Sequence, residues 1–263
     1  MAPWFVRRQQ CLQRRLRLFC FPYAGGGSLI FRQWAERLPH NVEVIAVELP
    51  GRGARLKERP FYRLRDLVVA LIDPISQLLD VPYVFFGHSM GAMIAFELTR
   101  ALRRCNLPQP EQLFVSGRPA PHIVDLERLT FNLPDTELVV ELKKLNGTPP
   151  EVLSHLELME VMLPLIRADF ELVQTYEYLA EGPLECPIAV FGGVKDIDVP
   201  ECKLWPWCEH TSSDFSLRML EGDHFFLKSS RNELLSLLSQ DLTSLMNCRM
   251  GRWLSDKSRA LLT

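Results

Sequence analysis

One serine stands in a setting that could turn its hydroxyl into a nucleophile. Ser89 is the middle residue of GHSMG (87–91), which follows the apolar run YVFF (83–86) and precedes the helix-like AMIAFELTRALR (92–103). A GxSxG match alone occurs by chance in about one chain in ten of this length. A nucleophile elbow also needs a strand, a tight turn and a helix, with small residues on both sides of the serine. Because all of these are present, the segment predicts an exposed serine on a strained turn.

A serine hydroxyl attacks only when a base takes its proton, and a carboxylate must hold that base. On a sheet with such an elbow the chain order is serine, acid, histidine. His224, in LEGDHFFL (220–227), follows a late apolar strand and is the expected base. His210 precedes that strand and would lie at its wrong end. His88 adjoins the serine, where neighbouring side chains diverge, so we expect it to support the turn.

Three aspartates are candidates for the acid. Asp196 follows PIAVFGG (187–193) by a short turn and is the expected partner of His224. Asp198 is the alternative, two residues further on. Asp223 is adjacent to the histidine in sequence, which makes a pairing of the two side chains awkward. Each of these aspartates could otherwise cap a helix or close a turn.

An oxyanion hole needs two backbone N–H groups, one from the residue after the nucleophile and one from a loop after an early strand. Met90 supplies the first, and FCFPYAGGG (19–27) supplies the loop, with Ala24 or Tyr23 as the second donor. A phosphate-binding loop is the competing interpretation of the three glycines. Neither GxGxxG nor GxxxxGK[ST] is present, which disfavours it.

The elements that must position these residues alternate along the chain. Continuous apolar runs, typical of strands buried on both faces of a parallel sheet, lie at 16–21, 42–49, 83–86, 112–116, 187–193 and 215–220. Helical patterns lie at 29–38, 61–80, 90–104 and 231–246. This alternation predicts an α/β fold with a mostly parallel, doubly wound sheet.

The interval 118–182 breaks this alternation, because it contains no convincing strand. A helix is expected over 133–145, a stop over 146–150, and a second helical stretch over 151–179 that Pro164 should kink or split. The stretch 151–179 has more apolar residues than one buried face of a helix requires. We therefore expect a helical lid over a ligand cavity; a second small core without a functional role is the alternative.

These patterns divide the chain into a core (1–117 and 183–246), the inserted lid (118–182) and a tail (247–263) that is either frayed or an extra helix. The first acidic residue is Glu36, and a cluster of arginines precedes it: Arg7, Arg8, Arg14, Arg15 and Arg17. A targeting peptide, a patch for an acidic partner and a solvated lead-in all fit this cluster. The lead-in is favoured, because a strand already begins at residue 16.

Composition excludes several classes of function. A net charge of −2 gives no reason to expect nucleic acid, and the longest aliphatic run, 67–72, is too short to span a membrane. Seven cysteines without a CxxC pair favour a reducing compartment, so a cytoplasmic protein is expected. Cys202, Cys208 and His210 are spaced irregularly for zinc and have no fourth ligand nearby. We expect no metal and no cofactor.

The chain resembles the type II thioesterases, stand-alone α/β-hydrolases that serve polyketide synthases, nonribosomal peptide synthetases and animal fatty acid synthase. Matching motifs cover nearly everything from residue 16 to about residue 245: FCFPYAGGG (19–27), LPGRGAR (49–55), FFGHSMGAMIAFEL (85–98), LNGTP (145–149), LPLIRADF (163–170), GGVKDIDV (192–199) and LEGDHFFL (220–227). The Arg-rich start and the segment 246–263 match nothing in the family.

The resemblance implies a triad of Ser89, Asp196 and His224, with Met90 and Ala24 as oxyanion donors. It implies an acyl thioester on the phosphopantetheine arm of an acyl or peptidyl carrier protein as substrate. The enzyme would be a monomer that binds its carrier transiently and clears stalled arms. The lid, with Met159 and Met162, would line the acyl channel. Two alternatives stay open: a carboxylesterase or lipase acting on oxygen esters, and a catalytically silent binding protein.

Overall fold

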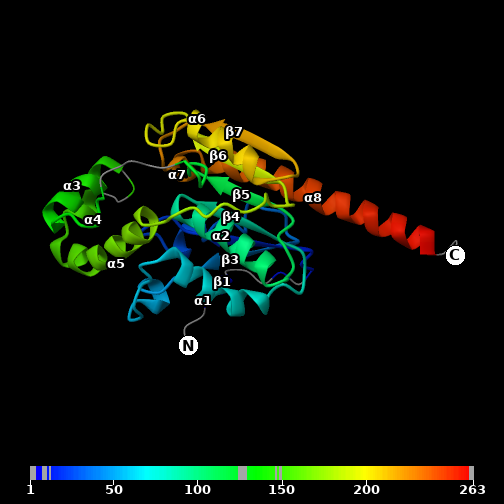
Figure 1. Ribbon diagram of the computed structural model, residues 1–263, viewed down its shortest axis with the longest axis horizontal. Coiled ribbons are helices and arrows are strands. Elements are labelled where there is room, and N and C mark those ends of the chain that lie inside the picture. Colours follow the sequence, from blue (N-terminus) through cyan, green and yellow to red (C-terminus); the bar gives the residue numbers. More distant parts are fainter. Residues whose placement is uncertain are drawn as a thin grey trace.

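A seven-stranded sheet is the centre of the structure, a computed structural model that describes residues 4–7, 11, 13–123, 129–145, 147 and 150–260 (Figure 1). Pro150 and residues 249–260 are described by their backbone alone. In spatial order the strands are β1 (Phe5–Arg7), β3 (Val42–Val47), β2 (Leu16–Phe21), β4 (Tyr83–His88), β5 (Leu113–Ser116), β6 (Ile188–Gly193) and β7 (Phe215–Leu220). All neighbours pair in parallel except β1, which is antiparallel to β3. The predicted α/β class and its six strands are confirmed.

Both faces of the sheet are buried, which explains the continuous apolar runs. Along β2, Leu16, Leu18 and Cys20 contact one core cluster, and Phe19 and Phe21 contact the other. Helices α1 (Leu64–Ser76) and α2 (Met90–Arg104) cover the face with Phe19 and Phe21. Helix α8 (Arg231–Ala260) covers the other face with its residues as far as Met246. Successive side chains of one strand therefore pack into two different cores, one on each face of the sheet.

Two elements differ from the sequence-based expectation. The three-residue strand β1 was missed, because so short a segment shows no period. The helix expected over 29–38 is a 3₁₀ turn, η1 (Ser28–Phe31), followed by further turns. Phe31, Trp34 and Leu38 are buried there, and successive bonds from the Trp34 N–H to the Phe31 carbonyl and from the Arg37 N–H to the Trp34 carbonyl measure 3.1 and 3.0 Å. Successive three-residue turns bury apolar residues three or four positions apart, which is the same sequence spacing that an α-helix shows.

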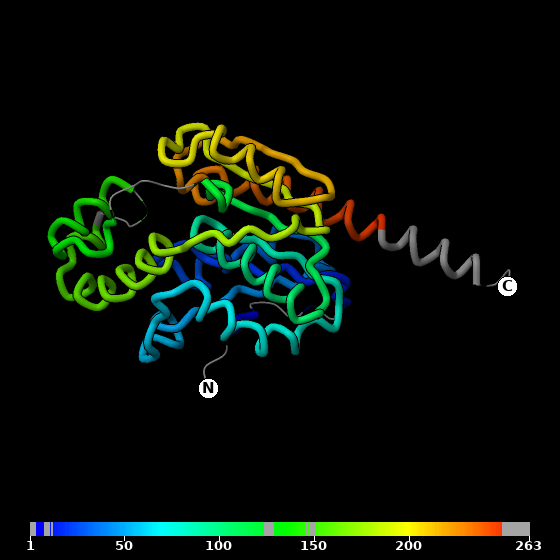
Figure 2. Tube along the Cα trace, viewed as in Figure 1, coloured from blue at the N-terminus to red at the C-terminus, as the bar shows by residue number. Residues whose placement is uncertain are grey.

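The lid contains α3 (Asp135–Leu145), α4 (Pro150–Leu153) and α5 (Leu156–Gln174), which share an apolar cluster of their own. Pro164 lies inside α5 and does not split it; Figure 2 shows α5 as one continuous turn of tube after another. The break lies earlier, at Ser154 and His155, where the His155 side chain accepts the Leu158 N–H at 3.4 Å. Residues 124–128, 146, 148 and 149 of the predicted lid lie outside the described residues, and its limits at 118 and 182 stay a prediction.

The segment after residue 246 is helical as far as Ala260, since α8 continues through it. Of the two alternatives for the tail, the helix is therefore the observed one; residues 261–263 lie outside the described part. No helix among the described residues has the length and apolar character that crossing a membrane requires.

Among the described N-terminal arginines, Arg7, Arg14 and Arg15 are exposed, as a solvated lead-in predicts, whereas Arg17 is part of the core. Arg17 is buried, donates to Glu43 at 2.6 Å and also pairs with Asp80. Arg7 reaches Glu43 at 3.2 Å and Arg14 reaches Asp80 at 3.2 Å. The charge asymmetry of the sequence is thus balanced by two acidic residues from later elements; Arg8 lies outside the described residues.

His210 is buried away from the elbow, in an aromatic cluster. Its ring packs on Phe96, Trp207 and Tyr178, and its Nε2 lies 2.7 Å from His122 Nδ1. Among the described residues, no three His, Cys, Asp or Glu side chains are grouped to hold a metal ion. Burial, together with the neighbouring His122 and Arg100, lowers the pKa of His210 to about 4.

This lowered pKa predicts acid sensitivity. The unfolded chain protonates His210 near pH 6.5 and the folded chain only near pH 4, so stability falls as the pH drops through that window. Urea unfolding at pH 7.5 and 4.5 measures the loss. The His210→Gln variant, which keeps a hydrogen-bonding group for His122, should lose about 2 kcal/mol less than the wild type between these pH values. Equal losses of stability in the variant and the wild type would contradict a lowered pKa of His210.

Candidate functional site

Ser89 occupies the turn between β4 and α2 in a backbone conformation rare for a side-chain-bearing residue, with φ of 52° and ψ of −113°. Its N–H donates to the Ser116 carbonyl at 2.8 Å, which ties the turn to β5. A Cβ on Gly87 would lie 2.1 Å from the Gly91 carbonyl oxygen, and one on Gly91 would lie 2.1 Å from the Phe21 carbonyl oxygen. Both glycines are therefore required by close backbone approach, and the strained elbow exists as predicted.

His224 and Asp196 meet at the carboxyl edge of the sheet, from the loops after β7 and β6. His224 Nδ1 lies 2.7 Å from Asp196 Oδ2, and the carboxylate is buried. The other oxygen, Oδ1, accepts the N–H groups of Asp198 at 3.2 Å and Val199 at 3.0 Å. These bonds fix the carboxylate, so it can hold the imidazole in one orientation.

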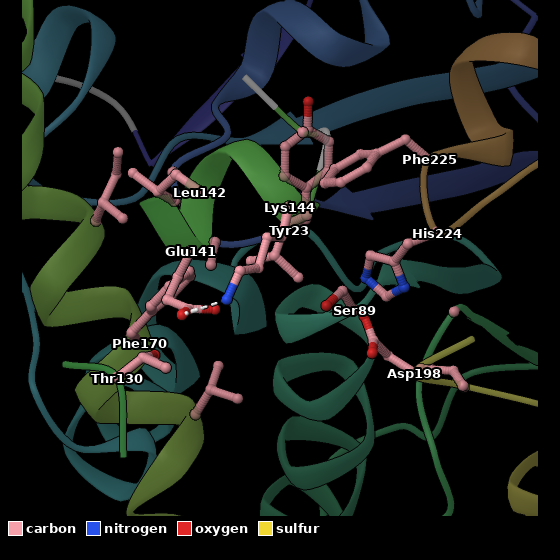
Figure 3. A pocket seen from close by; sticks show the side chains of 18 of the residues that line it. Tyr23, Ser89, Thr130, Glu141, Leu142, Lys144, Phe170, Asp198, His224 and Phe225 are labelled. Carbon is pink, nitrogen blue, oxygen red and sulfur yellow. Dashed lines mark hydrogen bonds and ion pairs between the residues drawn. The ribbon is translucent and has the colours of Figure 1, made fainter. Parts of the chain in front are cut away.

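The two other aspartates have different surroundings. Asp198 is exposed and lines the cavity in front of the serine, and Asp223 Oδ1 accepts the Phe225 N–H at 2.9 Å in the turn of the histidine loop. Figure 3 shows the Ser89 side chain beside the His224 ring, with Asp198 on the same wall of the cavity. The structure thus brings Ser89, His224 and Asp196 together.

His88 lies behind this group. It is fully buried, its Nδ1 is 2.8 Å from Ser116 Oγ, and its ring centroid is 5.2 Å from that of His224. Burial holds the pKa of His88 well below its usual range, and the nearby His224 acts in the same direction. A neutral His88 places no competing positive charge beside the ring of His224.

The glycine loop after β2 forms the next part of the cavity wall, through Tyr23, Ala24 and Gly25. Two of its N–H groups are engaged elsewhere: Gly25 donates to Asp169 Oδ2 at 2.7 Å, and Gly26 donates to the Tyr23 carbonyl at 2.9 Å. Tyr23 and Ala24 therefore remain the candidates for the second oxyanion donor, as the sequence left them. Met90 begins α2, where the first N–H groups of a helix have no partner within it.

A buried ion pair joins this loop to the lid. Arg52, in the loop after β3, donates Nη1 to Asp169 Oδ2 at 2.9 Å and Nη2 to Asp169 Oδ1 at 2.8 Å. Its Nη1 also donates to the Gly26 carbonyl at 2.8 Å. Sequence reasoning missed both charged residues as site residues. Their only signal was the position of each within a matching motif, LPGRGAR (49–55) and LPLIRADF (163–170).

A cavity of about 690 Å³ opens in front of the serine, between the core and the lid. Helix α5 contributes one apolar face to it: Leu158, Met162, Ile166, Phe170 and Val173. Polar side chains line other parts of the wall, and Figure 3 shows the pair Glu141 and Lys144 of α3, whose charged atoms are 2.8 Å apart, across the cavity from His224.

Of the two methionines expected in the acyl channel, only Met162 lines the cavity. Met159 is buried in the lid's own apolar cluster with Leu138 and Leu163. The reason is the helical period, since residues 158, 162 and 166 share one stripe of α5 whereas 159 and 163 form the neighbouring stripe. The prediction for Met159 was wrong.

The lid also contacts the histidine loop. Lys228 donates its Nζ to the Gly147 carbonyl at 2.8 Å and lies over the Phe225 ring at 4.7 Å. A Cβ on Gly147 would lie 2.2 Å from Phe225 Cζ, so the lid backbone approaches this ring closely. Burial lowers the pKa of Lys228. The cavity therefore has lid contacts at two ends, one at the glycine loop and one beside His224.

Comparison with known proteins matches this architecture. The family model described as "Thioesterase domain" covers residues 16–242, from β2 into α8. The chain belongs to the thioesterase family. The gramicidin S biosynthesis protein GrsT of Aneurinibacillus migulanus is 43% identical over 239 residues, which cover 91% of this thioesterase and 93% of GrsT.

Solved structures agree. RedJ, a thioesterase from the prodiginine biosynthetic pathway of Streptomyces coelicolor, superposes with a TM-score of 0.83 at 38% identity, covering 88% of this chain and 87% of RedJ. BorB, the type II thioesterase of the borrelidin biosynthetic cluster, gives 0.83 at 34% identity, covering 90% and 96%. The predicted α/β-hydrolase fold and the resemblance to type II thioesterases are confirmed.

The elbow geometry predicts the effect of one methyl group. Gly87→Ala should destabilise the thioesterase by about 3 kcal/mol or more, because a Cβ 2.1 Å from a backbone oxygen forces the turn apart. Gly182→Ala is the matched control, since no atom lies within 4 Å of its added Cβ, and it should change stability by less than about 0.5 kcal/mol. Thermal unfolding compares the two; equal shifts would contradict the crowding.

Proposed function

We propose that this thioesterase hydrolyses acyl thioesters with Ser89 as nucleophile, His224 as base and Asp196 as the residue that orients the base. The observation that carries the proposal is the 2.7 Å contact between His224 Nδ1 and Asp196 Oδ2, beside a strained serine. Since Nδ1 is occupied by the carboxylate, Nε2 is the nitrogen left to take the proton of the serine hydroxyl.

In the first step, Ser89 Oγ attacks the thioester carbonyl carbon while His224 Nε2 takes the hydroxyl proton. The negative charge that develops on the carbonyl oxygen is stabilised by the N–H groups of Met90 and Ala24. As the tetrahedral intermediate collapses, the C–S bond breaks and His224 returns the proton to the departing thiolate. The products are a free thiol and an acyl ester on Ser89.

In the second step, His224 takes a proton from a water molecule, and the resulting hydroxide attacks the acyl ester. The same two N–H groups stabilise the second oxyanion. The C–O bond to Ser89 breaks, and the serine recovers its proton from His224. The acid leaves, and the enzyme is restored with no cofactor in the cycle.

The proposed substrate is an acyl or peptidyl group on the phosphopantetheine arm of a carrier protein, in nonribosomal peptide or polyketide synthesis. Family membership and relatives such as GrsT and RedJ support this class of substrate. A cavity of about 690 Å³ fits a medium-sized acyl group together with the end of the arm. The carrier would bind transiently to a monomeric thioesterase, and the reaction would free arms blocked by unproductive acyl groups.

Two substitutions test the triad on an acyl-pantetheine thioester, with a third as their control. Ser89→Ala should lower kcat by about 10⁴-fold or more, since it removes the nucleophile. Asp196→Asn should lower kcat by about 10³- to 10⁴-fold, because His224 loses the carboxylate that fixes its tautomer.

Asp198→Asn is the matched control for the acid. Its carboxylate contributes no bond to His224, so the fall in kcat should stay below about tenfold. A larger loss in the Asp198 variant than in the Asp196 variant would reverse the assignment. Near-wild-type turnover by Ser89→Ala would rule out the covalent mechanism.

The cavity predicts a change in chain-length preference. Met162→Trp should fill part of the apolar face of α5 and lower kcat/KM for long acyl chains relative to acetyl by about tenfold or more. Met159→Leu, a change of similar volume in the lid cluster, should leave this ratio within about twofold. The ratio is measured across a series of acyl-pantetheine thioesters, so a general loss of folded protein cancels. An unchanged ratio in Met162→Trp would place the acyl chain elsewhere.

A further inference from the structure

We propose that Asp169 of the lid is a positioning residue for the oxyanion hole, so that lid helix α5 is part of the catalytic apparatus as well as a wall of the cavity. This inference rests on the proposed function of Ser89 and His224. Its basis is that the Asp169 carboxylate accepts the N–H of Gly25, the residue directly after the proposed donor Ala24.

The glycine loop is held here through one backbone N–H and one backbone carbonyl. Asp169 Oδ2 accepts the Gly25 N–H at 2.7 Å, and Arg52 Nη1 donates to the Gly26 carbonyl at 2.8 Å. Arg52 and Asp169 are joined by two parallel bonds of 2.9 and 2.8 Å. One buried ion pair therefore fixes both the peptide plane between Ala24 and Gly25 and the carbonyl of Gly26. The Ala24 N–H shares its peptide plane with the Tyr23 carbonyl, which accepts the Gly26 N–H at 2.9 Å, so this turn couples the direction of the Ala24 N–H to the part of the loop that the pair holds.

Contact between the loop and α5 is also steric. Gly25 has a φ of 74°, and a Cβ added to it would lie 3.2 Å from Ile166 Cγ1, on the turn of α5 before Asp169. The backbone of the loop thus rests directly on the lid helix. Seating of α5 against Gly25 therefore restricts the conformations open to the loop on its lid side.

Burial makes the connection strong. Arg52 is 6% exposed and Asp169 is 2% exposed, so separating them would leave a charge in a low-dielectric setting. Arg52 Nε is buried without a hydrogen-bond partner among the described residues, so the guanidinium acts through its two Nη groups. Asp169 consequently holds the loop only while α5 is seated on the core. An α5 displaced to admit a substrate would take the acceptor from Gly25, and full oxyanion stabilisation would return only when α5 is seated again.

The expected signature is kinetic. A donor that is misplaced weakens binding of the transition state more than binding of the ground state, so kcat falls while KM changes little. A merely structural role for Asp169 would lower the amount of folded enzyme without this split. The two roles are therefore distinguishable on purified, folded protein.

The variant that separates them is Arg52→Met combined with Asp169→Leu. Apolar residues of similar volume often replace a buried ion pair without loss of stability, so this double variant should fold. Its Gly25 N–H has no acceptor, and kcat for an acyl-pantetheine should fall by about 10²- to 10³-fold with KM within about threefold. Asp169→Asn, which keeps one acceptor oxygen, should recover part of kcat.

Glu171→Gln is the matched control on the same helix. Glu171 lies two residues after Asp169 and forms a lid-to-core ion pair with Arg63 at 2.5 Å, with no contact to the glycine loop. Loss of this pair should leave kcat within about twofold. In ¹⁵N-labelled protein the Gly25 amide proton should shift upfield in Asp169→Asn and stay in place in Glu171→Gln, because its charge-assisted bond is weakened only in the former.

The outcomes decide the proposal. A double variant that is folded and keeps kcat within threefold of the wild type, or that loses activity through KM alone, overturns it. If the double variant does not fold, the kcat of Asp169→Asn and its Gly25 resonance decide: an unmoved resonance with unchanged kcat overturns the inference. Failure of the proposed function looks different, since the wild type itself would then show no turnover that depends on Ser89.

Discussion

The buried pair of Arg52 and Asp169 is the interaction on which the arrangement of this site depends. It joins three segments that are distant in sequence: the glycine loop after β2, the loop after β3 and lid helix α5. Its Coulombic gain is set against the cost of taking two charges out of water, and buried pairs of this kind are often close to neutral for net stability. What it supplies is a fixed geometry, because neither charge can leave its partner without being stranded.

The opposite wall of the site depends on sterics. Ser89 holds a φ of 52°, and this strain persists because β4, β5 and α2 surround it closely. Gly91 lies against the Phe21 carbonyl, at the end of the strand that leads into the glycine loop. The serine turn and the strand end that leads into the glycine loop are thus in close backbone contact. A charged pair fixes that loop on its lid side and close packing fixes it on its elbow side.

Much of this could be predicted from the sequence, because the relevant signals are local. Strands buried on both faces leave continuous apolar runs, and an elbow leaves two glycines around a serine. The order of acid and base along the chain then singled out Asp196 and His224, and the structure places these two side chains 2.7 Å apart. Their catalytic roles stay a proposal that the geometry supports.

The features that were missed have non-local causes. The pair Arg52 and Asp169 spans 117 residues, and no sequence pattern says that two charges so far apart will meet. β1 is too short to show a period, and its place is set by pairing with β3. Met159 and Met162 differ by less than one helical turn, so only the packing of α5 on α3 and α4 decides which of them faces the cavity.

The central claim is that every substrate passes through one acyl ester on Ser89, within a site assembled from core and lid. Product partitioning in the presence of methanol tests it most directly. The same acyl group is presented on a carrier protein and on free pantetheine, and the ratio of methyl ester to free acid is measured for each. A common acyl-enzyme predicts the same ratio from both thiols. A ratio that changes with the leaving thiol would contradict the account.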